Sequence, residues 1–335
     1  MKIEAYNPSA REEWNSFITA SRNGTFLFDR AYMEYHADRF PDHSRLMRND
    51  KGELLAIFPA SAAGDTVTSH GGLTYGGCIM SERMTAPLML RGMTVLIESL
   101  KAEGFRQLIY KTMPRIFHRM PADEDQYALF SAGAELYRRD VWSVIEQSRR
   151  PPLQERRERS LRKAARRDLH IQETQDFAAF WEILAANLHE RYGLKPVHSL
   201  EEILLLRSRF PLSIRLFGCF EGPLMMAGAV VYDTGSVAHV QYNAASPQGK
   251  ELGALDLLLE TLISQTYSSH AYFDLGSSTE TDGRYLNRGL VEQKEGFGAR
   301  TIAHDFYRLD LTNWQPQRME CGERSTRAIE AVHRQ

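Results

Sequence analysis

The sequence predicts an α/β (α+β) protein made of two similar units, each a mixed, mostly antiparallel sheet flanked by helices. Three observations support this prediction: strands and helices follow the same order in both halves, a basic proline-containing segment separates the halves, and 335 residues exceed one ordinary domain. The 43% hydrophobic and 25% charged content is typical of a folded globular chain. We therefore divide the chain into residues 1–148, residues 149–312 and a polar tail, residues 313–335.

In the first half, short apolar runs alternate with turn residues. Alternating apolar residues bounded by Asn, Asp, Gly or Pro are typical of strands. The expected strands are residues 44–50, 52–61, 67–78, 105–114 and 135–147. Between the third and fourth of these, residues 86–104 have the apolar spacing of a helix and end at a glycine.

The junction between the halves is the clearest change in composition. Within residues 147–170 a double proline, Pro151 and Pro152, is followed by a basic run that favours a helix. The cations spread around such a helix, which favours a solvated face. A basic helix at this junction can also contact phosphates of a nucleotide-linked acceptor, a lipid headgroup or tRNA. The cations are Arg156, Arg157, Arg159, Arg162, Lys163, Arg166 and Arg167.

The second half repeats the order after two helical lead-ins. The expected elements are helices 176–193 and 200–210, a hairpin of strands 214–222 and 224–235, strand 239–244, helix 253–265 and closing strands 271–276 and 299–311. Residues 246–254 contain the Pro and Gly of a turn that opens into the helix. Such a turn directs backbone N–H groups and the positive end of a helix dipole at an anion. A polar loop, residues 277–298, precedes the last strand.

Composition limits the partners and the compartment. A net charge of -2 argues against attraction of the whole surface to DNA or to a membrane. No apolar run approaches the ~20 residues of a membrane helix, and the first residues lack a signal-peptide pattern, so we expect a cytoplasmic protein. Cys78, Cys219 and Cys321 are odd in number and far apart, which predicts reduced thiols and no metal centre. No sequence feature sets an oligomeric state.

Three segments carry a resemblance to a known superfamily. They are residues 159–172 at the junction, residues 241–263 in the second half, and residues 273–300 near the end. With these segments, residues 1–311 resemble the GNAT acyltransferase superfamily, and specifically its double-GNAT, Fem-type (FemAB-like) branch. The last segment is the most specific, because an acidic residue, a glycine, a lysine and a Phe-Gly pair recur before the final strand of that branch. Here these are Asp274, Gly276, Lys294, Phe297 and Gly298.

The resemblance implies an N-acyltransferase that moves an acyl group from a thioester, acyl-coenzyme A, to an amine. The acceptor that it implies is a small molecule such as a sugar amine, or a cell-envelope precursor. Some Fem-type enzymes take an aminoacyl group from charged tRNA instead, which is the main alternative. A non-catalytic binding protein on the same fold is a second alternative.

The usual GNAT pyrophosphate loop has Gln or Arg, then Gly three residues on, then Gly or Ala two residues later. Lys250 and Gly253 match the first two positions, whereas Leu255 departs from the third. The departure keeps the binding-protein alternative open. The expected donor-binding residues are Gln248, Gly249, Lys250, Gly253 and Ala254.

Transfer to an amine needs a deprotonated amine, a polarised carbonyl and close contact between them. Strict alternation along residues 239–244 places His239, Gln241 and Asn243 on one face, which offers a base and two amides. A hydrogen-bonded sheet surface is the alternative reading of this face. Asp274 ends its strand, where it either orients the acceptor or serves as the base; the alternative is that it caps the next turn. We expect catalytic roles for His239, Tyr242 and Asp274, with direct attack on the donor because no nucleophile arrangement stands out.

Acceptor contacts are expected from both halves. Glycines on both sides of Tyr75 either leave the backbone open to a ligand or permit bulges in a strand. Lys294 either neutralises a phosphate, which the resemblance favours, or forms a surface ion pair. The expected acceptor-binding residues are Tyr75, Lys111, Gln241, Ser277, Asn287 and Lys294. Of the second-half residues, we expect one cavity to be lined by Tyr242, Asp274, Ser277, Asn287 and Lys294.

Overall fold

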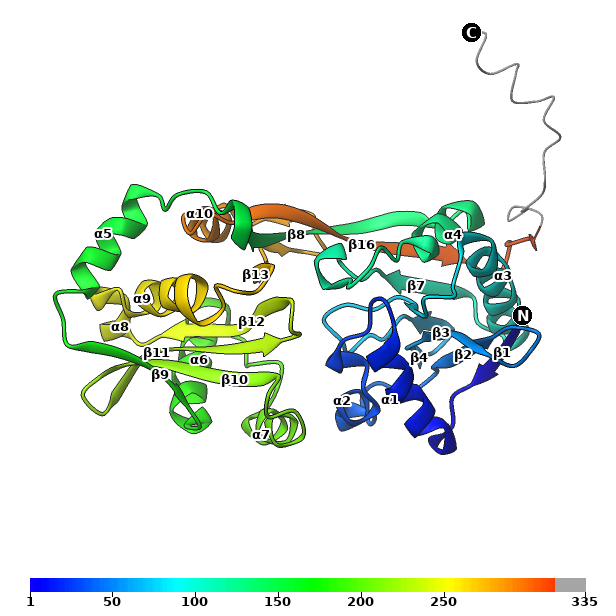
Figure 1. The fold of residues 1–335 in the computed structure, drawn as a ribbon, viewed down its shortest axis with the longest axis horizontal. Coiled ribbons are helices and arrows are strands. Elements are labelled where there is room, and N and C mark those ends of the chain that lie inside the picture. The colour runs from blue at the N-terminus through cyan, green and yellow to red at the C-terminus, as the bar shows by residue number, and fades with distance from the viewer. Residues whose placement is uncertain (317–335) are drawn as a thin grey trace, which may run out of the picture.

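The computed structural model describes residues 1–316 and shows two mixed α and β lobes that lie side by side (Figure 1). Two long strands, β8 (Glu135–Glu146) and β16 (Arg300–Asp310), run along the same side of both lobes and join them. Cys78 and Cys219 are buried free thiols. Residues 317–335, which include Cys321 and most of the expected tail, lie outside the described residues.

One ten-stranded sheet passes through both halves in the order β4-β5-β7-β16-β8-β13-β12-β11-β10-β9. The first half contributes β4 (Ser61–Ala63), β5 (Thr66–Thr68), β7 (Gln107–Lys111) and β8, and the second half contributes β9 (Leu169–Thr174), β10 (Ile214–Glu221), β11 (Leu224–Asp233), β12 (Val237–Ala245), β13 (Tyr272–Ser277) and β16. A four-stranded sheet holds β1 (Lys2–Ala5), β2 (Arg45–Arg48), β3 (Leu54–Phe58) and β6 (Ile79–Met80), and a two-stranded one holds β14 (Thr279–Glu280) and β15 (Tyr285–Leu286).

The two halves exchange their last strands. Each half has one parallel pair, β5 with β7 and β12 with β13. In the sheet, β7 of the first pair also pairs with β16 of the second half, and β13 of the second pair also pairs with β8 of the first half. The sequence predicts a sheet for each half, and this exchange instead merges the two into one. The boundary near residue 148 remains a proposal about the repeating unit, because β16 lies between strands of the first half.

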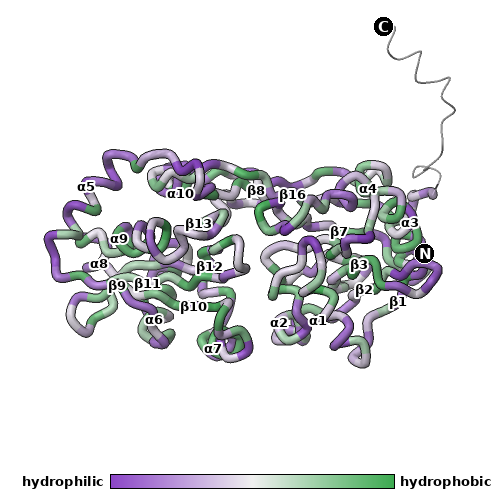
Figure 2. The backbone as a smooth tube through the Cα atoms, in the orientation of Figure 1, coloured by the Kyte–Doolittle hydropathy of each residue, from purple (hydrophilic) through white to green (hydrophobic). Residues whose placement is uncertain are grey.

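Helices flank the sheet, and they include every segment for which the sequence predicts a helix as well as several that it does not predict. They are α1 (Arg11–Ala20), α2 (Arg30–Met33), α3 (Ala86–Ala102), α4 (Glu124–Ala132), α5 (Glu155–Ala164), α6 (Phe177–Tyr192), α7 (Leu200–Arg209), α8 (Pro247–Leu252), α9 (Ala254–Thr261) and α10 (Arg288–Glu295). Short 3-10 turns lie at Pro8–Ala10, Phe26–Phe28, Glu34–His36, Arg115–Phe117 and Gln147–Arg149, and a π-helical segment, Leu262–Thr266, extends α9. Apolar residues are frequent along β10 and β11 inside the second lobe, whereas α5 at its edge is strongly polar (Figure 2).

Three segments differ from the sequence prediction. The strand expected at residues 67–78 ends at Thr68, because the chain turns at His70, which has a φ of 48°, and at Gly76 it comes back too close to Ser69 for a Cβ atom. The turn expected at residues 246–254 is the short helix α8, in which Ser246 Oγ accepts from the Gly249 amide at 3.0 Å. Part of the expected polar loop is α10, which is capped by Asn287.

Aromatic side chains pack the two lobes together. Tyr32 of the first half lies within 6.2 Å, centroid to centroid, of Phe210 and Tyr232 of the second, and its hydroxyl donates to the Tyr232 hydroxyl at 3.3 Å. Phe26 packs edge-on or tilted against the same two rings, with centroids 5.4 Å from Phe210 and 5.5 Å from Tyr232. These residues belong to a buried cluster that contains side chains from both halves. The lobes therefore share a core as well as a sheet.

We expect heating to unfold the described part of the chain in one cooperative transition, because neither lobe has a complete sheet or core without the other. Replacing Tyr32 by Ala should lower the stability by about 3–5 kcal/mol, as for other buried aromatic side chains, and keep the single transition. Calorimetry checks both statements. Tyr127→Ala is the control, since this tyrosine is 54% exposed. Two separate transitions in the wild type would contradict the shared core.

Candidate active site

A cavity opens where two parallel strands part. β12 and β13 pair only through Val237–His239 and residues 272–274. Beyond that point β13 shifts its register against β8 between Asp274 and Ser277, and Gly276 takes a φ of 73°. Both features bend β13 away from β12. The wedge between the strands leads into a cavity of about 1190 Å³ that extends across both lobes.

A β-bulge at Gln241 sets which side chains share a face of β12. Val231 pairs with Val240 and Val230 pairs with Tyr242, so Gln241 is the extra residue. One extra residue reverses the alternation that follows it. Tyr242 therefore lies on the face of His239, and Asn243 lies on the opposite face. The prediction that His239, Gln241 and Asn243 share one face is wrong for this reason.

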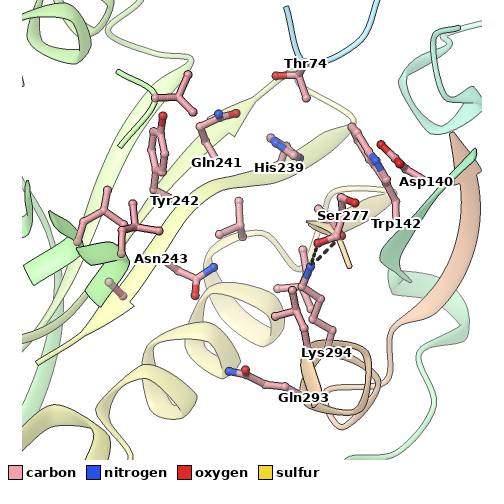
Figure 3. A pocket seen from close by; sticks show the side chains of 18 of the residues that line it. Thr74, Asp140, Trp142, His239, Gln241, Tyr242, Asn243, Ser277, Gln293 and Lys294 are labelled. Carbon is pink, nitrogen blue, oxygen red and sulfur yellow. Dashed lines mark hydrogen bonds between the residues drawn. The ribbon is translucent and has the colours of Figure 1, made fainter. Parts of the chain in front are cut away.

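His239 and Asp274 form a buried pair at the apex of the wedge. His239 Nδ1 lies 2.7 Å from Asp274 Oδ2, and the second carboxylate oxygen accepts from the Gly276 amide at 2.7 Å. Asp274 is fully buried, whereas His239 is 7% exposed and lies on the cavity wall (Figure 3). With Nδ1–H donated to the carboxylate, Nε2 keeps its lone pair. The arrangement can therefore accept a proton from a bound group.

Trp142 of β8 holds the imidazole from one side. Its ring stacks on that of His239, with centroids 5.6 Å apart and planes at 26°. β8 belongs to the first half, and its pairing of Trp142 with Ser277 brings the indole to the wedge. The ring of the candidate base is thus fixed by one residue from each half.

Lys294 of α10 fixes the end of β13. Its Nζ donates to the carbonyls of Gly276 at 2.9 Å and Ser277 at 2.6 Å (Figure 3). Burial lowers the pKa of Lys294 to about 8, and the nearby Asp274 carboxylate opposes this shift. Asp274 binds the N–H of Gly276 while Lys294 binds its carbonyl, so both side chains hold the same peptide segment.

The structure brings together most of the residues expected in the site. The cavity wall contains His239, Gln241, Tyr242, Gly249, Lys250, Gly253, Ser277, Lys294 and Lys111. Asp274 reaches the cavity only through His239. The structure corrects the expectation for four residues that are outside the wall: Tyr75, Gln248, Ala254 and Asn287.

Each of these four side chains has another position. The buried Tyr75 hydroxyl is 2.9 Å from Thr25 Oγ1, and Ala254 is fully buried. Gln248 is exposed, with its amide donating to Glu221 at 2.9 Å. Asn287 caps α10 by accepting from the Leu290 amide at 3.0 Å and donates to Glu280.

The expected donor loop is engaged in its own helix. The amides of Gly249 and Lys250 donate to Ser246, and the Gly253 amide donates to Lys250. Side chains at the two glycines would collide with neighbouring elements: a Cβ atom at Gly249 would lie 2.0 Å from the Met226 carbonyl oxygen, and one at Gly253 would lie 2.7 Å from Ser160 Oγ. Packing of α8 on β11 and of α9 on α5 therefore accounts for both glycines.

The junction helix α5 flanks this end of the cavity. Arg157 points inward, where it forms an ion pair with Asp256 in the first turn of α9 and lies over the Phe297 ring. Arg157 and Ser160 line the cavity. The other cations of this segment are exposed, as a solvated face requires: Arg156, Arg159, Arg162, Lys163, Arg166 and Arg167.

Sequence reasoning missed the contribution of β8 and β16. Arg138, Asp140 and Trp142 of β8 and His304 of β16 line the cavity. Charged residues that alternate along β8 were a signal for a polar cavity face. Within residues 1–316 no group of His, Cys, Asp and Glu could hold a metal ion, and no helix is both long and apolar enough to cross a membrane.

No family model and no curated protein matches the sequence, whereas solved structures match the fold. FemX is 12% identical with a TM-score of 0.62, over 92% of this chain and 97% of FemX. The C-terminal domain of a putative lysylphosphatidylglycerol synthetase from Agrobacterium fabrum is 13% identical with a TM-score of 0.60, over 96% and 95% of the chains. A tandem GNAT protein from the clavulanic acid biosynthesis pathway is 10% identical with a TM-score of 0.50, over 92% and 98%.

At these identities the similarity concerns the fold. It agrees with the parallel pair in each half, with the exchange of strands between the halves and with the resemblance seen in residues 273–300. The chain therefore has a Fem-type fold of tandem GNAT-like units.

Proposed function

We propose that this protein transfers an acyl or aminoacyl group to an amine, with His239 as the general base. The buried His239–Asp274 pair carries the proposal, because it lies where β12 and β13 part and faces a cavity large enough for two substrates. The similarity to FemX and to a tandem GNAT protein supports the same class of reaction.

The geometry fits direct attack of the amine on the donor. The amine nitrogen attacks the carbonyl carbon and passes a proton to His239 Nε2, while Asp274 stabilises the imidazolium that forms. A carbon–nitrogen bond forms, and the bond from carbon to the thiol sulfur or ester oxygen of the carrier breaks. A bulged residue is left out of the ladder, so the backbone at Gln241 can offer its N–H to the developing oxyanion.

The remaining contacts of the pair keep the base in place. Trp142 fixes the plane of the imidazole, and Lys294 holds the Gly276–Ser277 segment that binds Asp274. We assign positioning roles to both residues, since each acts through the base or its carboxylate. Tyr242 shares a face with His239, but its hydroxyl is 2.6 Å from His198 Nδ1, so a catalytic role for Tyr242 has no geometric support beyond its place on the wall.

Two donors remain candidates, acyl-coenzyme A and charged tRNA. The first turn of α9 can offer amides to a pyrophosphate, as the thioester donor requires. One observation favours tRNA: α8 engages the amides of Gly249 and Lys250, and α5 presents exposed cations beside the same end of the cavity. A polyanion can reach those cations from solvent, and the acyl group would enter past Arg157 and Ser160.

Replacing His239 by Gln should lower kcat/KM roughly 100- to 10,000-fold, because the amide keeps a hydrogen-bonding group near Asp274 and cannot accept the proton. Asp274→Asn should also lower kcat/KM, because it removes the charge that stabilises the imidazolium. Amide formation from acetyl-coenzyme A and from charged tRNA, with a panel of amines, measures both. Gln248→Ala is the control, because this exposed residue of α8 lies outside the cavity wall. A folded His239→Gln protein with the wild-type rate would overturn the role of this base.

Charge removal from α5 separates the two donors. We expect a triple variant, Arg159→Gln, Arg162→Gln and Lys163→Gln, to weaken binding of charged tRNA and to reduce the slope of log K against log salt by about two to three. The matched control is Lys51→Gln, Arg83→Gln and Arg91→Gln on exposed positions of the first half. Binding is measured by titration of the whole chain at several salt concentrations.

A donor that binds also raises the melting temperature by mass action. Stabilisation by acetyl-coenzyme A alone, unchanged in the α5 variant, would assign the thioester donor instead. Absence of a response to both donors, together with absence of transfer, would overturn the acyltransferase proposal and leave a binding protein. Gly253 is unsuitable for this test because its φ of 77° and its contact with Ser160 make any side chain disruptive.

A further inference from the structure

The floor of the cavity continues past the wedge into the first lobe. Phe306 of β16 pairs with Lys111 of β7 on one side and with Arg138 of β8 on the other, so the three side chains form one row. His304 and Asp140 form the next row. All five residues line the cavity. This polar floor lies on β7 and on the exchanged strands β8 and β16, and it takes no part in the chemistry described above.

Lys111 is a buried cation that has no carboxylate partner among residues 1–316. Its side chain is 6% exposed, and the one hydrogen bond that the structure gives Nζ goes to the Leu73 carbonyl oxygen. Asp140 faces it, but both oxygens of Asp140 are taken by Arg138, at 3.1 and 2.8 Å. The other titratable groups nearby are His70 and His304. A buried ammonium with one neutral acceptor lacks the compensation that buried charges normally have.

Two further polar atoms on this floor have no partner. His304 binds the Thr112 carbonyl through Nε2 at 2.8 Å, while its buried Nδ1 is unpaired. Trp142 Nε1 is also buried and unpaired. Buried polar groups in folded proteins are usually satisfied, so two unpaired atoms and an ammonium with a single acceptor on one cavity wall indicate a ligand that supplies the missing interactions.

We propose that this end of the cavity is the acceptor subsite and binds an anionic group of the acceptor, a carboxylate or a phosphate, on Lys111. The identification of the bound molecule as the acceptor rests on the proposed function, whereas the presence of an anion site does not. The rings of Trp142 and His304 separate the subsite from His239, with centroid distances of 5.6 Å from His239 to Trp142 and 4.9 Å from Trp142 to His304. The acceptor is therefore an extended molecule, with its amine at His239 and its anionic group beyond Trp142.

The lowered pKa of Lys111 predicts a pH dependence of stability that a bound anion would change. Burial lowers the pKa of Lys111 to about 7, below the value of about 10.4 of an unfolded lysine. The unfolded chain then binds more protons between these values, so the penalty of the buried charge is complete below pH 7 and disappears as the pH rises towards 10. A bound anion would remove the penalty at low pH.

The test compares the wild type with Lys111→Met, which keeps the length of the side chain and removes the charge. At pH 6.5 we expect the unliganded variant to melt at a higher temperature than the wild type, and the difference to shrink towards pH 10. Inorganic phosphate or succinate, against sodium chloride at equal ionic strength, should raise the melting temperature of the wild type and leave the variant unchanged. Response to phosphate alone assigns a phosphate group, and response to succinate alone assigns a carboxylate.

Lys195→Met is the control, since Lys195 is an exposed lysine on the wall of the cavity in the other lobe. It should keep the anion response. A Lys111→Met protein that is less stable than the wild type at every pH would show a structural role and overturn the proposal. An equal response of wild type and variant to both anions would also overturn it. Neither readout needs transfer, so failure of the anion site is distinct from failure of the acyltransferase proposal, which the His239→Gln variant tests.

Discussion

The reciprocal exchange of β8 and β16 is the constraint on which the site depends. β13 carries Asp274, and its only partner besides β12 in the large sheet is β8, which comes from the other half of the chain. Without β8 the wedge would have no second wall and His239 would lose the Trp142 ring. β16 in turn places His304 and Phe306 between β7 and β8. The cavity is therefore a product of both halves, and neither half contains it alone.

Opening the wedge also frees backbone groups that a closed parallel pair would satisfy. Buried N–H and C=O groups need partners, and at Gly276 both partners are side chains. Asp274 takes the N–H, and Lys294 takes the carbonyl of Gly276 and that of Ser277. The carboxylate that orients His239 thus also closes the end of the strand. This double role explains why an acidic residue and a lysine are needed on either side of a bend that separates two strands.

Local patterns predicted most elements, because alternation and helical spacing are properties of short segments. The strands at residues 135–147 and 299–311 were predicted from such patterns, but their partners were not, since pairing across the halves depends on contacts far apart in the sequence. The bulge at Gln241 has no Gly or Pro to mark it, and it alone moved Tyr242 to the face of His239. Asn287 was predicted to bind the acceptor, because a helix cap and a ligand-binding residue are both polar. Only the knowledge that α10 begins directly after Asn287 distinguishes the two roles.

The two buried lysines of the cavity show how the same residue type serves different purposes. Lys294 has two carbonyl partners and the Asp274 carboxylate nearby, so its charge is compensated within the protein. Lys111 has one carbonyl, and the carboxylate that faces it is already paired with Arg138. Burial lowers the pKa of both lysines; the Asp274 carboxylate opposes this shift at Lys294, whereas the Arg138 guanidinium adds to it at Lys111. A lysine whose charge is compensated by its own chain stabilises the local fold. A buried lysine with few partners on a cavity wall can instead bind an anionic group of a ligand.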